Sequence, residues 1–367
     1  MNKPQGNDGD PPAPASIGEL RDALLAHPRI LALGGGSKWT RRRTADGIVP
    51  ISTAAFRGIT EYQPDEYTIS ARSGTPLREV EAALQEHGQF LPFDPPFAAD
   101  GATLGGAVAT GLSGSGSQRH GQMRDFILAV QLMTGNGSLI RGGARVVKNS
   151  AGFDLPKLVV GSLGRFGILT EITFKVFPAP AAVRHLRVHC PDLNDAVARI
   201  IRLNRSHLVL DALDLEPPGT LHLTLAGQAD SLVERVDRLG AFLDREVSNG
   251  EPDLLNRRMA APPAGDGEGC RVKLALTPSA IPAIDRDFRA AGARTLYTFG
   301  GATGWVAWPG NASSLISILN RHQLTGMVFR GDGAPHLAGG FPGAVMADRI
   351  RHALDPDDRF PGLPGSL

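Results

Sequence analysis

A glycine-rich stretch over residues 100–121 constrains this chain more than any other feature of its sequence. It holds seven glycines, and small hydroxyl and methyl side chains separate them instead of the charged residues of a flexible linker. Glycine has no Cβ and tolerates unusual backbone angles, so N–H groups in such a stretch can approach an anion closely. The segment that begins at Gly105 is expected to form a short helix with its first N–H groups free for a phosphate. The stretch predicts a site for a pyrophosphate-bearing cofactor; a glycine-rich surface turn is the alternative.

Two common nucleotide motifs are absent from the sequence. A Walker loop needs Gly-Lys followed by Ser or Thr, and the chain contains no Gly-Lys dipeptide. The Rossmann fingerprint needs three glycines spaced G-x-G-x-x-G, and the pair Gly114 and Gly116 has no third glycine at that spacing. The predicted cofactor site therefore follows neither pattern.

Composition describes an ordinary globular protein. The chain has 367 residues, of which 42% are hydrophobic and 20% charged, enough for two domains with large cores. The formal net charge of +1 favours neither nucleic acid nor an anionic membrane surface. Two cysteines, Cys190 and Cys270, are too few for an iron–sulfur cluster, so any such cluster would belong to another subunit.

The beginning of the chain and its apolar runs bear on location. Residues 1–15 are polar and rich in proline and glycine, which predicts a disordered tail without the apolar core of a signal peptide. The longest apolar run, over 126–133, is far shorter than the roughly 20 residues that span a bilayer. We expect a cytoplasmic protein.

Four segments in a fixed order identify the family that the chain resembles. They read Ala-Thr-Leu-Gly-Gly-Ala-Val-Ala-Thr-Gly-Leu-Ser-Gly over 102–114, Arg-Asp-Phe-Ile-Leu over 124–128, Lys-Asn-Ser-Ala-Gly-Phe-Asp-Leu over 148–155 and Gly-Ile-Leu-Thr-Glu over 167–171. This order resembles the FAD-binding oxidases of the vanillyl-alcohol oxidase or PCMH type, and among them the glycolate oxidase FAD-binding subunits. The resemblance implies an oxidoreductase that uses FAD and acts on CH–OH donors.

The expected fold is α+β with two domains. The resemblance implies a two-lobed PCMH-type FAD-binding domain over 16–180, after the tail at 1–15. Beyond a proline-rich boundary, strand and helix patterns repeat in the order strand, helix, strand, strand, helix, which predicts two related halves sharing one antiparallel sheet. We assign this smaller α+β cap domain to 181–332, and residues 333–367 to a C-terminal segment that returns to the FAD domain.

The resemblance also implies a set of FAD contacts. A strand over 30–33 runs into three glycines and a serine, a loop that lies on the FAD pyrophosphate in the family. This loop has neither His nor Cys for a covalent link, so we predict noncovalent FAD. The implied contacts are Gly34, Gly35, Gly36, Ser37, Thr103, Gly105, Gly106, Ala107, Thr110, Gly111, Ser113, Gly121, Asp125, Gly167 and Ile168.

Two departures from the family pattern bear on these contacts. Leu33 stands before the glycines where the family usually has Arg, and the C-terminal ending lacks the family's Asn.

Candidates for catalysis are few. His120 could face the flavin edge as a base, or could donate one hydrogen bond to a backbone carbonyl. Lys148 could stabilise an anionic reduced flavin, or could form a surface salt bridge. Arg330 belongs to a turn with an Asp and a His that could contact substrate or a partner, or could hold an ordinary salt bridge. His185 and His189 alone do not make a metal site, so no metal is predicted.

Three functions remain open from the sequence. The first is an FAD-binding subunit that works with a larger catalytic FAD subunit and an iron–sulfur subunit to oxidise glycolate, a 2-hydroxy acid, to glyoxylate. Such partners could bring the chain to the inner membrane as a peripheral protein. The second is a self-sufficient FAD-dependent oxidoreductase acting on another hydroxy acid or alcohol. The third is a non-catalytic assembly subunit of the same fold.

Overall fold

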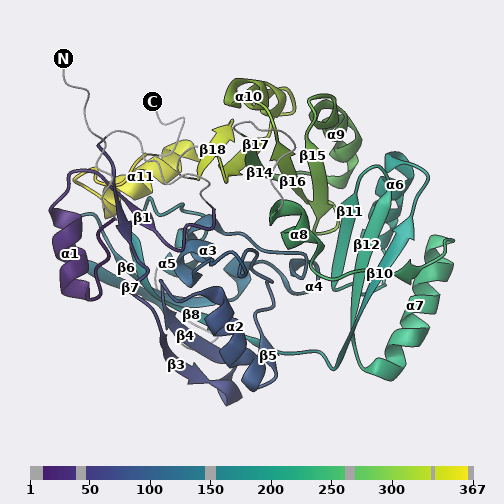
Figure 1. The fold of residues 1–367 in the computed structure, drawn as a ribbon, viewed down its shortest axis with the longest axis horizontal. Coiled ribbons are helices and arrows are strands. Elements are labelled where there is room, and N and C mark those ends of the chain that lie inside the picture. Colours follow the sequence, from purple (N-terminus) through teal and green to yellow (C-terminus); the bar gives the residue numbers. More distant parts are fainter. Residues whose placement is uncertain (1–10, 39–46, 145–153, 261–268, 332–334, 363–367) are drawn as a thin grey trace.

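A computed structural model describes residues 11–38, 47–144, 154–260, 269–331 and 335–362 (Figure 1). The described residues form two lobes side by side. The N-terminal lobe carries the glycine-rich segments, and the other lobe is built on one large sheet. Helix α8 (Leu254–Ala260) lies between the two lobes. The fold is the expected α+β arrangement.

The N-terminal lobe contains a small parallel pair and a larger antiparallel sheet. Strand β1 (Ile30–Leu33) pairs in parallel with β2 (Val49–Ser52), after helix α1 (Ile17–Leu25). The larger sheet has five strands in the order β3-β4-β8-β6-β7. These are β3 (Ile59–Gln63), β4 (Thr68–Arg72), β8 (Ile168–Lys175), β6 (Ile127–Met133) and β7 (Leu139–Gly143), and the short strands β5 (Gln89–Phe90) and β9 (Phe177–Pro178) form another pair.

Helices cover the core of this lobe. Helix α2 (Leu77–Glu86) buries Leu77, Val80 and Leu84, the face that its apolar spacing predicts. Helix α3 (Leu104–Thr110), within the glycine-rich stretch, consists almost entirely of apolar or small residues, so most of it can be buried. Helices α4 (Ser117–His120) and α5 (Leu155–Val159) follow it along the chain.

The second lobe is a nine-stranded sheet in which neighbouring strands run antiparallel. Its order is β13-β10-β12-β11-β15-β16-β14-β17-β18. The first half holds β10 (Ala182–His189), α6 (Leu193–Asn204), β11 (Ala212–Glu216), β12 (Thr220–Gly227), α7 (Ala229–Leu243) and β13 (Ser248–Asn249). The second half holds β14 (Cys270–Ala275), α9 (Ile281–Ala290), β15 (Arg294–Thr298), β16 (Thr303–Trp308), α10 (Ala312–Arg321), β17 (Thr325–Phe329) and β18 (His336–Gly339).

The two halves of this sheet meet at one strand pair. Leu215 of β11 is opposite Tyr297 of β15, and both side chains are buried. The order β10-β12-β11 on one side corresponds to β14-β16-β15 on the other, so the halves are related. This confirms the predicted repeat and its shared antiparallel sheet.

Several local predictions were wrong. Thr75, before Pro76 and a helical pattern over 77–86, is the cap that the sequence predicts for α2. In the structure its hydroxyl instead donates to the Arg72 and Gly58 carbonyls, and Pro76 takes the cap position. Strands β3 and β18 and helix α8 were not predicted. The sequence also predicts a strand over 208–213, but the strand there, β11, begins only at Ala212.

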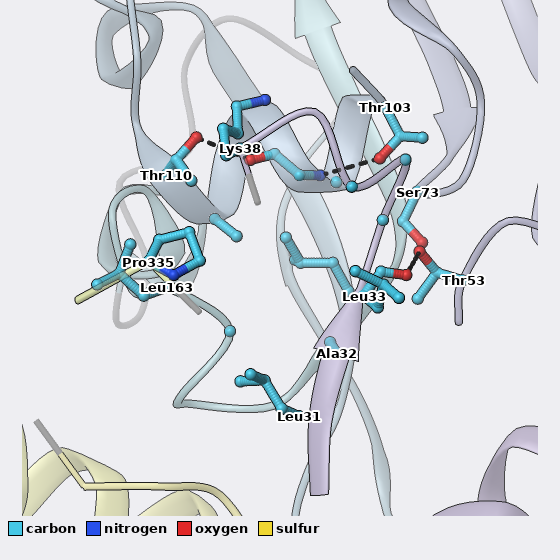
Figure 2. Close-up of a pocket in the computed structure, with 18 of the residues that line it drawn as sticks. Leu31, Ala32, Leu33, Lys38, Thr53, Ser73, Thr103, Thr110, Leu163 and Pro335 are labelled. Atoms are coloured by element: carbon cyan, nitrogen blue, oxygen red, sulfur yellow. Dashed lines mark hydrogen bonds between the residues drawn. The ribbon is translucent and has the colours of Figure 1, made fainter. Parts of the chain in front are cut away.

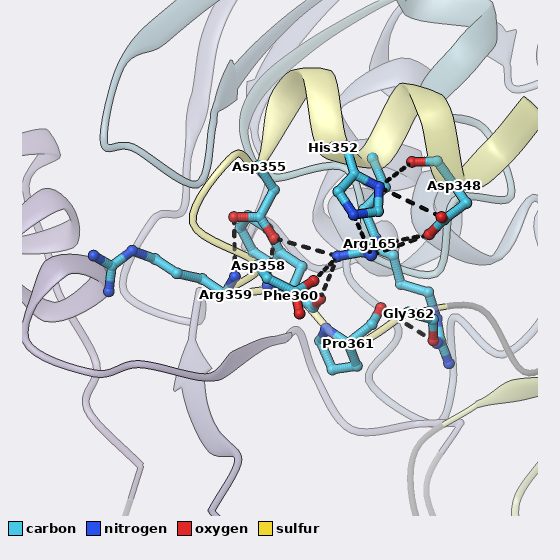
Figure 3. Close-up of polar contacts among 10 residues, drawn as sticks. Arg165, Asp348, His352, Asp355, Asp358, Arg359, Phe360, Pro361 and Gly362 are labelled. Carbon is cyan, nitrogen blue, oxygen red and sulfur yellow. Dashed lines mark hydrogen bonds and ion pairs between the residues drawn. The ribbon is translucent and has the colours of Figure 1, made fainter. Parts of the chain in front are cut away.

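The C-terminal segment docks on the N-terminal lobe (Figure 3). After α11 (Ala344–Leu354), the buried Asp355 carboxylate accepts the N–H groups of Arg359 and Phe360, at 3.0 and 2.7 Å. The Ile30 N–H at the start of β1 donates to the Arg359 carbonyl. Arg165 donates to the Gly362 carbonyl. These contacts fix the chain end beside the first strand.

Candidate cofactor and active site

A narrow pocket lies where β1 ends (Figure 2). Its lining comes from β1 and the loop after it, from α3 with the residue before it, and from the turn that precedes β8. The pocket encloses about 80 Å³. Of the predicted FAD contacts, it is lined by Gly34, Gly35, Gly36, Ser37, Thr103, Gly105, Gly106, Thr110 and Gly167.

The loop after β1 offers free donors to this pocket. Among the described residues, no acceptor is found for the N–H groups of residues 34–38. Consecutive N–H groups without partners are the feature by which glycine-rich loops bind phosphates. The loop also needs its glycines, since a Cβ on Gly35 would lie 1.8 Å from the Gly101 carbonyl oxygen and Gly36 has a φ of 72°.

Helix α3 does not supply the free donors that the sequence suggested. The N–H groups of Leu104 and Gly105 donate to the Thr75 and Ser73 carbonyls, and that of Gly106 donates to the Thr103 hydroxyl, which caps the helix. These bonds consume the first N–H groups of the helix. Its role is to hold the loops in place, and the loop after β1 provides the donors.

Six of the predicted FAD contacts do not line the pocket. The Ser113 hydroxyl accepts from the Met123 N–H, and the Asp125 carboxylate accepts from the Gln122 N–H beside Gly121. Gly111 ends α3 with a left-handed backbone. Ala107 and Ile168 are buried in the core. For these six residues an FAD contact stays a prediction.

The pocket also includes residues that sequence reasoning missed. Ser73 lines it with a buried hydroxyl that has no hydrogen-bond partner, and Lys38 lines it directly after the predicted loop. Others are Leu31, Ala32, Leu33, Thr53, Ala109, Leu163, Gly164, Leu169 and Pro335. Lys38 could have been predicted as a lining residue, because it directly follows the Gly-Gly-Gly-Ser loop in the sequence.

These features fit a pyrophosphate cofactor. The free N–H groups of the loop, the orphaned Ser73 hydroxyl and the Lys38 amine are all donors, and none of the described residues that line the pocket is acidic. A donor-rich pocket of this kind suits the phosphates of FAD.

Of the three catalytic candidates, His120 and Arg330 lie within the described residues. The His120 ring lies edge-on between the Phe90 and Phe177 rings, with centroids 5.7 and 5.6 Å away, and burial lowers its pKa. It lines a different cavity from the narrow pocket. Lys148 lies outside the described residues.

The third candidate, Arg330, is fully engaged at the junction of the lobes. Its Nε donates to the Ser37 carbonyl at 2.8 Å and its Nη1 to the Met259 carbonyl at 3.1 Å. Its Nη2 pairs with the Asp100 carboxylate, and the guanidinium lies over the Phe97 ring at 4.4 Å. Arg330 therefore positions the loop after β1.

Two further cations from β14 lie at this junction. Lys273 reaches across from the sheet, with its Nζ 3.5 Å from the Gly111 carbonyl, and burial lowers its pKa to about 8. Arg271 is buried and donates from Nε to the Met259 carbonyl. Together with Arg330 they form what we call the junction cations, a group that favours an anionic ligand beside the pocket.

A second cavity separates the N-terminal lobe from the first half of the large sheet. It encloses about 860 Å³ and is lined by β10, β11, β12 and residues around α4. Asp94 and Asp214 both line it, and burial raises the pKa of both carboxyls, that of Asp214 to about 7. Its acidic lining suits an anionic substrate less well than the junction cations do.

The described part of the chain contains neither a candidate metal site nor a candidate membrane-spanning helix. No cluster of three or more His, Cys, Asp or Glu side chains there could hold a metal ion. None of its helices is long and apolar enough to cross a membrane.

Comparison with known proteins supports an FAD site. Residues 13–143 match the FAD binding domain family. The chain is 39% identical over 199 residues to the glycolate oxidase subunit GlcE of Escherichia coli strain K12, covering 54% of this chain and 56% of that protein. It is 33% identical over 168 residues to a D-lactate dehydrogenase of Anaerostipes hadrus, covering 46% of this chain and 35% of that protein. The match thus spans about half or less of each relative's length.

The fold has solved counterparts. An alkyldihydroxyacetonephosphate synthase structure superposes with a TM-score of 0.67 at 16% identity, covering 94% of this chain and 74% of the other. At this identity the likeness concerns the fold alone. The chain therefore shares the fold of that structure over most of its length, in agreement with the predicted α+β fold class.

Proposed function

We propose that this chain, which carries a PCMH-type FAD-binding domain, is the FAD-binding subunit of a multi-subunit glycolate oxidase that oxidises glycolate to glyoxylate. The observation that carries the proposal is the position of the junction cations. Lys273 contacts the carbonyl of Gly111 and Arg330 contacts that of Ser37, both beside the predicted FAD pocket. A 2-hydroxy acid is an anion and needs such a charge. The similarity to a glycolate oxidase subunit supports the same function.

The proposal assigns roles to the residues of this chain. FAD, when bound, supplies the acceptor for the hydride that leaves the hydroxyl-bearing carbon. In the assembled enzyme, where partner subunits complete the substrate site, Lys273 contributes a positive charge for the substrate carboxylate, since its amine is less engaged than the guanidinium of Arg330. Phe97, Phe329 and Trp305 form a buried aromatic group that keeps water from the junction. We assign the hydroxyl proton to no described residue.

The cofactor contacts and domain limits belong to the same proposal. The FAD pyrophosphate lies on the loop of residues 34–37, and the FAD is noncovalent. The FAD-binding domain occupies 16–180, the cap 181–332 and the returning segment 333–367. The free N–H groups of the loop support the first of these assignments.

Partner subunits complete the proposed enzyme. The partners are a larger catalytic FAD subunit and an iron–sulfur subunit. The two cysteines of this chain are too few to ligate a cluster, so any cluster in the enzyme would lie in a partner. We place the chain in the cytoplasm, reaching the inner membrane only through these partners.

The visible absorption spectrum of the purified chain tests this proposal. We expect a yellow protein that releases its flavin on acid precipitation and stays oxidised when glycolate is added without oxygen. Adding the partner subunits should then allow glycolate to bleach the flavin. A chain that remains colourless after reconstitution with FAD would overturn the proposal in favour of an assembly subunit.

A second candidate function rests on the relatives that act on lactate. The similarity to a D-lactate dehydrogenase favours a self-sufficient FAD-dependent dehydrogenase. Bleaching of the isolated chain by glycolate or D-lactate, with no partner present, would establish this function and exclude the subunit role.

A further inference from the structure

The loop after β1 ends in a buried lysine with no acidic partner. Lys38 is only 5% exposed, and its Nζ lies 3.3 Å from the Ser37 hydroxyl and 5.9 Å from the Phe97 ring centroid. Among the described residues it makes no ion pair. Asp100, the acid whose charge acts on it, is already paired with Arg330. Burying a cation without a counterion is costly, so this arrangement calls for an anion from outside the chain.

Two segments bring charged groups to Lys38. Arg330, at the end of β17, donates its backbone N–H to the Lys38 carbonyl, and Asp100 approaches from the segment before α3. Residues 34–37 of the loop that bears Lys38 carry no charged side chain. Burial, and next the positive charge of Arg330, lower the pKa of Lys38 to about 7, while Asp100 acts in the opposite direction. Without bound FAD, the surroundings of Lys38 thus favour its neutral amine over the charged ammonium form.

We propose that Lys38 is an FAD-binding residue whose ammonium group pairs with the pyrophosphate of the cofactor. Lys38 lines the same narrow pocket as the free N–H groups of residues 34–37. The buried Ser73 hydroxyl without a hydrogen-bond partner lines this pocket too, and adds a further donor for phosphate oxygens. The proposal depends on FAD binding, the premise of the proposed function, but not on the identity of the substrate.

The pairing links FAD binding to protons. At pH 8 the free chain holds Lys38 largely neutral, because its pKa is about 7. The phosphates favour the ammonium form, so FAD binding takes up a proton at this pH. Affinity for FAD should therefore weaken as the pH rises from 7 to 9.

Two substitutions and a matched control test the pairing. Lys38→Met keeps the side-chain length without the charge, and Lys38→Arg keeps the charge at every pH. Lys157→Met removes an exposed lysine that pairs with Asp154 on α5. FAD dissociation constants are measured by fluorescence between pH 6.5 and 9, and proton uptake by calorimetry in buffers of different ionisation enthalpy.

The expected results separate the proposal from its premise. Lys38→Met should raise the FAD Kd about ten- to a hundredfold at pH 7 and remove the proton uptake. Lys38→Arg should bind FAD without pH dependence, and Lys157→Met should match the wild type. The melting temperature of the apo Lys38→Met protein should not fall, because a buried charge is removed.

Riboflavin, which lacks phosphates, identifies the group that Lys38 faces. Its Kd should be the same for wild type and Lys38→Met. An equal loss for riboflavin would place the charge at the flavin ring and overturn the pairing. Unchanged FAD affinity in Lys38→Met overturns the inference alone, whereas a wild-type chain that binds no FAD overturns the cofactor assignment along with it.

Discussion

Arg330 and Ser37 are joined by a hydrogen bond across 293 positions of the chain. The Nε of Arg330, at the end of β17, donates to the Ser37 carbonyl at 2.8 Å, and its backbone N–H donates to the Lys38 carbonyl at the same distance. The loop with free N–H groups is thus held from the large sheet as well as from β1. Arg330 has a φ of 49°, a left-handed backbone that is uncommon for arginine. The cap therefore helps to shape the predicted FAD pocket.

Replacing Arg330 should weaken FAD binding. Hydrogen bonds from a charged group contribute roughly 1.5–3 kcal/mol each, so losing the contact with Ser37 should raise the FAD Kd at least about tenfold in Arg330→Met. Titration of the apo protein with FAD measures this. Arg321→Met, which removes an exposed ion pair with Asp287, serves as the control and should have no effect. An unchanged Kd in Arg330→Met would mean that the loop keeps its shape without the cap.

A methyl group at Gly105 should disrupt the pocket, whereas one at Gly106 should be tolerated. A Cβ on Gly105 would lie 2.7 Å from Cβ and 2.9 Å from the carbonyl oxygen of Ser73, but on Gly106 it meets only the Thr103 hydroxyl at 3.2 Å. We expect Gly105→Ala to lower the free energy of unfolding by about 1–3 kcal/mol, and Gly106→Ala by much less. Urea unfolding with and without FAD checks both. Equal losses in the two variants would contradict the role given to the Ser73 contact.

Local sequence signals predicted the elements near the site well. The apolar face of α2 and the strand before Gly34 were found because their burial follows simple periodicity. The Thr75 cap was wrong because the Thr75 hydroxyl has two carbonyl partners, one of them 17 residues away. Contacts with a distant segment therefore determine the hydrogen bonds of Thr75, and local sequence does not reveal them.

The parts of the site that were missed depend on distant segments. Nothing near Lys38 in the sequence shows that Phe97 and Arg330 surround it. Helix α8 lies in a stretch that reads as loop, and it is fixed in part by Asn256, which accepts the Phe97 N–H at 2.8 Å. The family motif named several residues that do not line the narrow pocket, such as Asp125, whose carboxylate accepts the Gln122 N–H. The position of a residue in the motif does not tell whether its side chain lines the pocket or lies outside it.

Asp355 should be important for stability although it does not line the narrow pocket. Its carboxylate is fully buried and accepts two N–H groups, those of Arg359 and Phe360 (Figure 3). Asp355→Ala leaves both without acceptors, at a cost of about 2–4 kcal/mol in the free energy of unfolding. Denaturant unfolding measures this, with the exposed Asp357→Ala as control. A loss below about 1 kcal/mol would show that the C-terminal segment contributes little to the fold.

Asp214 presents a buried carboxyl to the large cavity. Its Oδ2 accepts from the Ser115 hydroxyl, while its buried Oδ1 has no partner. Burial, with a smaller contribution from the charge of Asp94, raises the pKa of Asp214 to about 7. The folded chain therefore keeps this proton at pH values where the unfolded chain, with an ordinary pKa near 4, has released it.

This difference sets the sign of a pH effect on stability. Between about pH 4 and 7 the folded state binds more protons at Asp214 than the unfolded state, so stability falls as the pH rises through this window. Asp214→Asn cannot ionise and should lose that decline, gaining up to about 4 kcal/mol relative to wild type between pH 4 and 8. Urea unfolding at several pH values measures the difference, and the exposed Asp230→Asn should follow the wild-type curve. Parallel curves for wild type and Asp214→Asn would mean that Asp214 is ionised in the folded chain, with a counterion or water at its second oxygen.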